Sequence, residues 1–190
     1  MEPVSPLIVI TGPTASGKSG LAMELAQKYG GEIICADSRT VYKGMDIGTA
    51  KPTEQDQALV PHHLLDVVAP NQTFTVADFQ KLARAAIDDI RARGRVPFLV
   101  GGSGLYIDSV VLNYTLPSQE DHAVRVAQRQ VLESKSVEEL QQLIKKQQLE
   151  LPHNLKNKRY LVNTLLRTNL QVERNTAPQT NTHVVAIATE

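Results

Sequence analysis

This chain lacks the features that would place it among disulfide-linked, membrane-spanning or highly charged proteins. It has one cysteine in 190 residues, so no disulfide can form within the chain. No apolar run approaches the roughly 18 residues of a membrane span, and the N-terminus has no basic region followed by a long apolar core. We therefore expect a cytoplasmic protein with no membrane partner. Twenty basic residues balance twenty acidic ones, so a nucleic acid would have to meet a local basic patch. Cys35 lies in an apolar stretch, which favours a small buried hydrophobe over a reactive thiol.

Short apolar runs alternate with helical patterns along most of the chain. The runs at residues 7–10, 33–36, 64–68, 96–100 and 184–188 are typical of strands buried on both faces. The clearest helix opens with a capping box from Thr75 to Asp78 and ends at Gly94. Its apolar stripe comprises Val76, Phe79, Leu82, Ala83, Ala86, Ile87 and Ile90. The alternation predicts an α/β fold with a doubly wound, mainly parallel sheet.

The pattern changes after about residue 116. Three amphipathic helices are predicted near residues 120–133, 136–148 and 155–168, the second opened by a capping box from Ser136 to Glu139. We assign residues 1–116 and 183–190 to the sheet domain, 117–175 to a helical insertion and 176–182 to a linker. A doubly wound sheet normally packs a helix behind its last strand, so the stop at Glu190 favours a fragment of a longer gene product.

A glycine-rich phosphate-binding motif follows the first predicted strand. Residues 12–19 fit G-x-x-x-x-G-K-S, and a helix follows directly, as in phosphate-loop NTPases. In such a loop the glycines turn backbone N–H groups inward, Lys18 supplies positive charge, and Ser19 can hold Mg²⁺. The helix also directs the positive end of its dipole at the same point. The predicted phosphate ligands are Gly12, Thr14, Ala15, Ser16, Gly17, Lys18 and Ser19.

Two further segments are predicted at the same edge of the sheet. Asp37 follows the second strand and Ser103 lies in the glycine-rich stretch after the fourth, where α/β proteins place ligands. Asp37 could instead cap a turn or bind a metal, and the glycines could serve only a tight turn. Asp66 is a weaker candidate metal ligand.

Two groups of basic or imidazole side chains have less specific signals. His62 and His63 lack partners at metal-binding spacing, so we interpret them as loop residues. Four cations in the last predicted helical region form either a solvated helix face or a phosphate-binding patch for nucleic acid. They are Lys156, Lys158, Arg159 and Arg167.

Together these segments resemble the tRNA dimethylallyltransferases, also called adenine N6 isopentenyltransferases. The likeness is carried by GPTASGKS at residues 12–19, ADSRTVYKGMDIGTAKP at 36–52, PHHLLD at 61–66 and VGGSGLY at 100–106. It covers residues 7 to about 113 strongly and the helical stretch loosely. Four joint segments are far more specific than a phosphate loop alone.

The resemblance implies a reaction. The phosphate loop would hold dimethylallyl diphosphate, and the N6 amine of the adenine 3′-adjacent to the anticodon in tRNA would displace the diphosphate. Lys18 and Mg²⁺ at Ser19 would stabilise the departing charge, Asp37 would accept the amine proton, and Ser103 would orient the amine or the phosphate. The adenine would be swung out of its loop to reach the allyl carbon. The implied tRNA contacts are Asp37, Ser38, Arg39, Thr40, Ser103, Arg125, Lys158 and Arg159. We expect a monomer that binds the anticodon stem-loop.

The sequence departs from the family pattern at several places. Thr40 and Ser103 stand where the family usually has Gln and Thr, and only Arg159 remains of an Arg-Arg-x-x-Arg pattern. The family also continues past the last strand into helices that help hold the diphosphate, and this sequence ends before them. Three alternatives stay open: prenyl transfer to a free adenine nucleotide, a small-molecule kinase or NTPase, and a non-catalytic binding domain.

Overall fold

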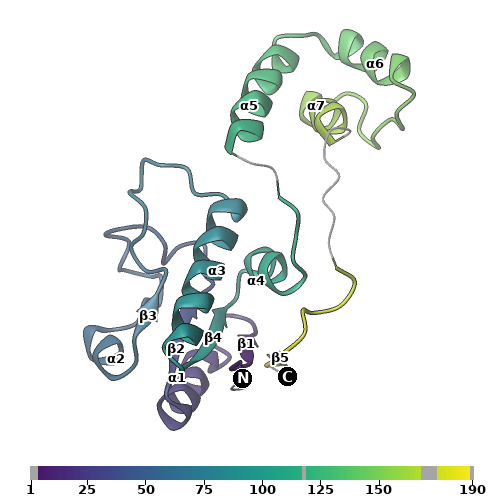
Figure 1. The fold of residues 1–190 in the computed structure, drawn as a ribbon. Helices are drawn as coiled ribbons and strands as arrows, with labels where there is room; N and C mark the ends of the chain where they lie inside the picture. Colours follow the sequence, from purple (N-terminus) through teal and green to yellow (C-terminus); the bar gives the residue numbers. More distant parts are fainter. Residues whose placement is uncertain (1–3, 117–118, 168–174, 189–190) are drawn as a thin grey trace. The chain divides into compact units, whose positions relative to one another are not determined.

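The computed structural model describes residues 4–116, 119–167 and 175–188, and the chain divides into two compact units. The first unit comprises Met1–Tyr114 and Arg174–Glu190, and the second comprises Thr115–Glu173. The first is built around a β-sheet, and the second consists of helices (Figure 1). No helix within the described ranges combines the length and the apolar character that a membrane span requires.

The first unit contains a five-stranded parallel sheet. Its strands are β1 (Leu7–Thr11), β2 (Gly31–Cys35), β3 (His62–His63), β4 (Val96–Gly101) and β5 (Thr182–Ala186). Their spatial order is β3-β2-β4-β1-β5, and every neighbouring pair is parallel. The chain therefore crosses over between strands, which confirms the predicted doubly wound α/β fold.

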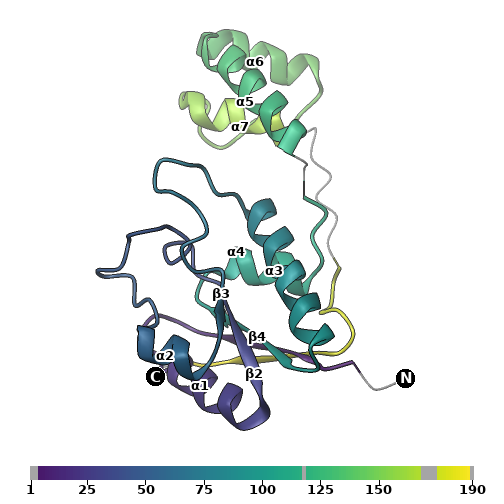
Figure 2. The ribbon, with the colours of Figure 1, turned by 60° about the vertical axis from the view of Figure 1, so that its left-hand side comes forward.

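Helices cover both faces of this sheet (Figure 2). Successive strand residues point to opposite faces, so Ile34 and Leu99 join one core cluster while Ile33 and Phe98 join the other. The first cluster includes residues of α3 (Val76–Ala92) and α4 (Gly104–Val111), and the second includes residues of α1 (Lys18–Tyr29). Burial on both sides explains the continuous apolar runs of β1, β2 and β4. The run at residues 184–188, which we also predicted to be buried, was wrong in this respect: Val184 and Val185 of β5 are 47% and 41% exposed.

The helix ends are set by local signals. Thr75 and Asp78 form the predicted capping box of α3, and Gly30 ends α1 with a φ of 61°. A second capping box, from Thr53 to Asp56, opens the short helix α2 (Glu54–Leu59), which we did not predict. The stripe predicted for α3 was wrong at Leu82, which is 39% exposed; Gln80 is buried instead and donates to the carbonyls of Ser109 and Tyr114.

The predicted strand at residues 64–68 was wrong. The strand in this region is β3, which consists of the two histidines that we interpreted as loop residues. It stops there because Leu64 and Asp66 adopt positive φ angles of 64° and 54°, which an extended strand cannot accommodate. Val68 still forms an isolated bridge with Tyr42.

The second unit contains the three predicted helices. They are α5 (Gln119–Glu133), α6 (Val137–Lys146) and α7 (Lys158–Arg167). Ser136 and Glu139 form the predicted capping box at the start of α6. The unit has its own apolar core, made by α6 and α7 residues. Its buried members are Leu140, Ile144, Leu161, Val162, Leu165 and Leu166.

The segment that precedes β5 is bound to the first unit. We predicted residues 176–182 as a linker. In the structure the backbone N–H of Gln179 donates to Val111 O at 3.0 Å, and its side chain donates to Val110 O at 3.0 Å. Asn175 N–H donates to Leu112 O at 2.8 Å. These bonds supply donors to the carbonyls of Val111 and Leu112 at the end of α4, and a further donor to Val110 O, which also accepts Asn113 N–H at 3.3 Å.

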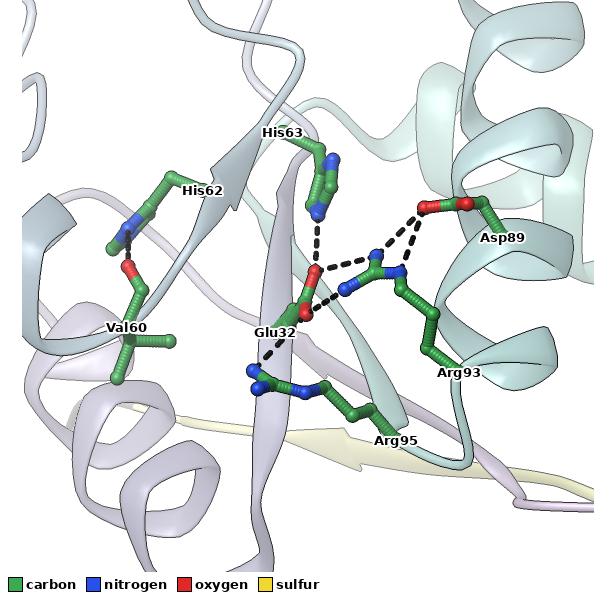
Figure 3. Close-up of polar contacts among 7 residues, drawn as sticks. All are labelled: Glu32, Val60, His62, His63, Asp89, Arg93 and Arg95. Carbon is green, nitrogen blue, oxygen red and sulfur yellow. Dashed lines mark hydrogen bonds and ion pairs between the residues drawn. The ribbon is translucent and has the colours of Figure 1, made fainter.

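A buried carboxylate joins β2, β3 and the end of α3 (Figure 3). Glu32 is 1% exposed; its carboxylate accepts bonds from Arg93 and from His63 Nε2 at 2.7 Å, and Arg95 lies at 3.1 Å. The Arg93 bonds, with a smaller contribution from His63, outweigh desolvation and lower the pKa of Glu32 to about 2. The ion is therefore charged and paired, as a buried carboxylate must be.

Candidate active site

The phosphate motif forms the predicted strand, loop and helix. β1 ends at Thr11 and α1 begins at Lys18, with Gly17 at the helix N-cap in the left-handed region at a φ of 81°. Ala15 also has a positive φ, 64°, and Ser16 N–H donates to Pro13 O at 3.3 Å. The backbone is thus tightly turned in front of the positive end of the α1 dipole, as an anion site requires.

Two polar side chains of this loop, Lys18 and Ser16, differ in their hydrogen bonding. Lys18 Nζ donates to Pro13 O at 3.0 Å, so the ammonium lies folded over the loop. Ser16 Oγ is the one buried side-chain polar atom among the described residues that has no hydrogen-bond partner. A buried, unpaired hydroxyl is costly, so it fits a site completed by a bound oxygen-rich ligand.

The β4 loop lies directly beside the phosphate loop. A Cβ added to Gly102 would be 3.4 Å from Gly12 O and 3.9 Å from Lys18 Nζ. A Cβ on Gly101 would be only 2.0 Å from Ala36 O, so glycine is required where β4 passes the end of β2. The predicted proximity of the two glycine-rich loops is confirmed by these distances.

Asp37 and Ser103 also meet at this edge. Ser38 N–H donates to Ser103 Oγ at 3.0 Å, and Ser103 N–H donates to Ala36 O at 3.2 Å. The half-buried Asp37 carboxylate accepts Arg39 N–H at 2.8 Å, which makes a tight turn after β2. The capping interpretation and a role toward a ligand are therefore compatible, since the bond from Arg39 N–H engages Oδ1 and leaves Oδ2 of Asp37 without a hydrogen bond from the described residues.

The residues around this turn differ in accessibility. Ser38 and Arg39 are exposed, whereas Thr40 is 4% exposed. The Thr40 side chain is thus mostly enclosed, and its hydroxyl makes only a long 3.4 Å contact with Asp37 O. Burial raises the pKa of Cys35 to about 12, helped by the charge of Asp37, which supports the prediction of an unreactive thiol.

An aromatic cluster of Phe74, Phe79 and Tyr106 adjoins the glycine-rich loop after β4, through Tyr106 N–H, which donates to Ser103 O at 2.9 Å. Tyr106, on α4, stacks on Phe79 with ring centroids 4.2 Å apart and contacts Phe74 edge-on at 6.4 Å. Burial raises the pKa of the Tyr106 hydroxyl, and the nearby Tyr42 and Asp37 act in the same direction. The neutral, packed ring fixes the start of α4 and with it Ser103.

The remaining predicted contacts belong to the second unit. Arg125 Nη2 donates to Leu166 O at 3.3 Å, which joins α5 to α7. Lys158 is half-buried and Arg159 is exposed at the start of α7. The exposed Lys156 precedes that helix, while the side chain of Arg167 lies outside what the structure describes. Lys156, Lys158 and Arg159 therefore lie at or just before the start of α7, in the second unit.

Metal-binding side chains are sparse in the described ranges. They contain no group of three or more His, Cys, Asp or Glu residues placed to hold a metal ion. Ser19, the predicted Mg²⁺ ligand, is exposed in the first turn of α1. Asp66, the weaker candidate, instead accepts a bond from Lys51 at 2.8 Å.

The fold and this edge define the class: a phosphate-loop α/β protein with a second glycine-rich loop beside the first. The chain belongs to the IPP transferase family, whose model matches residues 40–179. It is 59% identical over 112 residues to a tRNA dimethylallyltransferase of Roseiflexus sp. (strain RS-1), covering 59% of this chain and 37% of the relative. It is 44% identical over 146 residues to that of Streptococcus pneumoniae (strain ATCC 700669 / Spain 23F-1), covering 77% and 50%.

Solved structures agree with this assignment. The full-length tRNA isopentenylpyrophosphate transferase of Bacillus halodurans is 38% identical with a TM-score of 0.63, covering 96% of this chain and 59% of that one. A eukaryotic dimethylallyltransferase studied while acting on tRNA is 25% identical with a TM-score of 0.74, covering 98% and 49%. This chain thus spans half or less of the length of these two curated relatives.

Sequence reasoning missed some residues outside this edge. Thr53 and Asp56 carry the same capping signal as Thr75 and Asp78, so α2 could have been found. The pairing of Lys51 with Asp46 and Asp66 had no local signal, because the partners are 5 and 15 residues away.

Proposed function

We propose that this chain carries the diphosphate-binding and catalytic part of a tRNA dimethylallyltransferase. It transfers a dimethylallyl group from dimethylallyl diphosphate to N6 of the adenine 3′-adjacent to the anticodon. Family membership supports the reaction, and a relative that is 59% identical over 112 residues carries that name. The observation that carries the proposal is the meeting of the β1, β2 and β4 loops at one edge, through Lys18, Ser38 and Ser103.

The phosphate loop is suited to the diphosphate. Lys18 exchanges its contact with Pro13 O for diphosphate oxygens, and the Ser16 hydroxyl gains the partner that it lacks. Backbone N–H groups at the start of α1 add further donors. These groups favour the departing diphosphate more than the bound substrate, because negative charge grows on the leaving oxygen as the C–O bond breaks.

The Ser19 hydroxyl would hold Mg²⁺, since this ion keeps several waters and needs few protein ligands. A bound Mg²⁺ would supply positive charge to offset the charge of the leaving group. Ser19 and Lys18 share the first turn of α1, so the same helix start presents the hydroxyl and the ammonium. The exposed position of Ser19 leaves room for the waters that such an ion retains.

Asp37 is the proposed general base. As the N6–C bond forms and the C–O bond to diphosphate breaks, the Asp37 carboxylate accepts the amine proton. Its Oδ1 is held by Arg39 N–H, which fixes the direction of the group. Ser103 Oγ accepts Ser38 N–H at 3.0 Å, so its own O–H proton is free to be donated to the amine or the diphosphate.

The proposed tRNA contacts fall in two sets. Asp37, Ser38, Arg39, Thr40 and Ser103 lie in the sheet unit, and Arg125, Lys158 and Arg159 lie in the helical unit. Because Thr40 is enclosed, its share is confined to the backbone and the edge of its side chain. The cations of the helical unit suit phosphates of the anticodon stem-loop. We propose that the enzyme is cytoplasmic and monomeric. Light scattering on the purified chain tests the monomeric state.

The test is transfer of labelled dimethylallyl from its diphosphate to an unmodified anticodon stem-loop with magnesium present. We expect label on the adenine after the anticodon, with AMP a poor competitor. Preferential labelling of AMP would indicate the nucleotide enzyme, and steady ATP hydrolysis abolished by Lys18→Ala would indicate an NTPase. Stem-loop binding with no label on any acceptor would contradict catalysis by this chain.

A paired substitution tests the chemistry. Asp37→Ala should lower turnover by roughly 10²-fold or more while diphosphate affinity stays nearly unchanged, as for loss of a positioned general base. The matched control is Asp46→Ala, which removes a carboxylate that is 67% exposed and lies in a different turn. A large loss of diphosphate affinity in Asp37→Ala would instead indicate a metal-binding or folding role.

A further inference from the structure

Lys51 is an enclosed cation outside the proposed site. Its side chain is 8% exposed, and Nζ lies 2.5 Å from Asp46 Oδ1 and 2.8 Å from Asp66 Oδ1. A longer contact of 3.4 Å reaches Tyr42 O. Burial disfavours the ammonium, but the hydrogen bonds to Asp46 and Asp66 outweigh it and raise the pKa of Lys51. Lys51 is therefore a fixed positive charge with two carboxylate partners.

Asp66 links this charge to the turn that carries Asp37. Its side chain binds Lys51, while its backbone N–H donates to Thr40 O at 3.1 Å. Asp66 holds a φ of 54°, a conformation that costs energy in a residue other than glycine and needs support from its surroundings. The Lys51 bond is such support, since it restrains the Asp66 side chain.

The same turn is held by two further backbone bonds. Val68 N–H donates to Val41 O at 3.1 Å, and Lys43 N–H donates to Val68 O at 2.9 Å. With the Asp66 bond, they form a short ladder between residues 40–43 and 66–68. Each residue of this ladder lies within two sequence positions of Tyr42 or Asp66, which Lys51 contacts.

The chain between Tyr42 and Lys51 is otherwise weakly anchored. Most of it is exposed, and Ile47 is 99% exposed. Gly44, Gly48 and Ala50 all have positive φ angles. The Lys51 bonds to Asp46 and Tyr42 O close this loop on itself, and the bond to Asp66 attaches it to the ladder. Lys51 is thus where the loop and the ladder meet.

We propose that Lys51 is a positioning residue for the turn of residues 37–40, acting through Asp66 and Thr40. This rests on the proposed function, because the turn supplies the base that meets the acceptor amine. The Asp66 arm carries the effect, since its 2.8 Å bond is the shorter of the two contacts that reach the ladder; the contact with Tyr42 O is 3.4 Å. The Asp46 arm only closes the exposed loop.

Hydrogen exchange tests the tether without any activity. In Lys51→Met, the amides of Lys43, Asp66 and Val68 should exchange roughly tenfold or more faster than in the unchanged protein, because their bonds open locally. Asp66→Asn should act in the same direction. Asp46→Asn is the matched control and should leave these amides nearly unchanged. Circular dichroism confirms that each variant is folded. Unchanged exchange in folded Lys51→Met would overturn the proposal.

Kinetics then test the consequence. Lys51→Met should lower kcat for transfer by roughly 10- to 100-fold through displacement of the base, while the Kd for dimethylallyl diphosphate stays within a factor of about two. Lys51→Arg should recover much of the loss, since it restores the charge and the Asp66 bond. Faster exchange with an unchanged kcat would refute the positioning role. If the unchanged protein transfers no label at all, the proposed function fails, and the exchange results still decide whether Lys51 holds the turn.

Discussion

The ion network around Glu32 gives the most quantitative prediction. Glu32→Gln replaces the carboxylate by a neutral amide of the same shape and removes the anion that Arg93, Arg95 and His63 share, although Arg93 keeps Asp89. The pKa of Glu32 falls from its ordinary 4.5 to about 2 on folding. At about 1.4 kcal/mol per pH unit, this corresponds to about 3 kcal/mol of stability at pH 7.

The sign of the pH dependence follows from the lowered pKa. The contribution is fully present above pH 4.5 and is lost as pH falls toward 2, because protonated Glu32 resembles the glutamine variant. The difference in unfolding free energy between the two proteins should be about 3 kcal/mol at pH 7, slightly smaller at pH 4 and roughly half as large at pH 3. Both proteins therefore converge in acid.

Urea unfolding at these three pH values measures the difference. The matched control is Asp89→Asn, which removes the other partner of Arg93; Asp89 is 62% exposed, so the loss should stay below about 1 kcal/mol. Two results would refute the reasoning. One is a Glu32→Gln loss no larger than that of the control, and the other is a loss that stays constant from pH 7 to pH 3.

Three further predictions concern the loops at the active edge. Gly101→Ala should lower the free energy of unfolding by about 3 kcal/mol or prevent folding, because its Cβ would lie 2.0 Å from Ala36 O. The control Gly104→Ala, whose Cβ would have no neighbour within 4 Å among the described residues beyond its own turn of helix, should be neutral or slightly stabilising in thermal unfolding. Ser16→Ala should leave stability unchanged or raise it by about 1 kcal/mol, yet weaken diphosphate binding measured by calorimetry; tighter binding would contradict the assigned partner. Ser103→Ala should lower transfer while Ser103→Thr retains it, because the latter keeps the oxygen that accepts Ser38 N–H.

The sequence predicted those parts of the fold whose signals are local. The buried strands β1, β2 and β4 could be recognised as apolar runs because helices cover both faces of the sheet. The capping box of Thr75 and Asp78 indicated the start of α3. The strand predicted at residues 64–68 was wrong because apolar side chains occur both in strands and in buried loops. Leu64 and Asp66 have positive φ angles, and Asp66 is held by tertiary bonds to residues 40 and 51, which composition does not reveal.

The candidate site divides in the same way. The phosphate loop is a contiguous motif, so its backbone shape and its place before α1 could be predicted. The unpaired Ser16 hydroxyl and the Ser38 to Ser103 bond could not, because the latter joins residues 65 positions apart. The Glu32 network was missed for a similar reason, since its partners come from β3 and from the turn after α3.

The active edge is built largely from backbone contacts between strand ends, so its geometry depends on the register of the sheet. Thr11 pairs with Gly101, and Cys35 pairs with Val100, which sets the two glycine-rich loops and the Asp37 turn at matching heights. A slip of one residue would move a strand end by about 3.3 Å, more than a hydrogen bond tolerates. Only glycine at position 101 lets β4 approach Ala36 closely enough for Ser103 N–H to reach its carbonyl. The chemistry proposed for Asp37 and Ser103 therefore depends on a glycine that touches neither substrate.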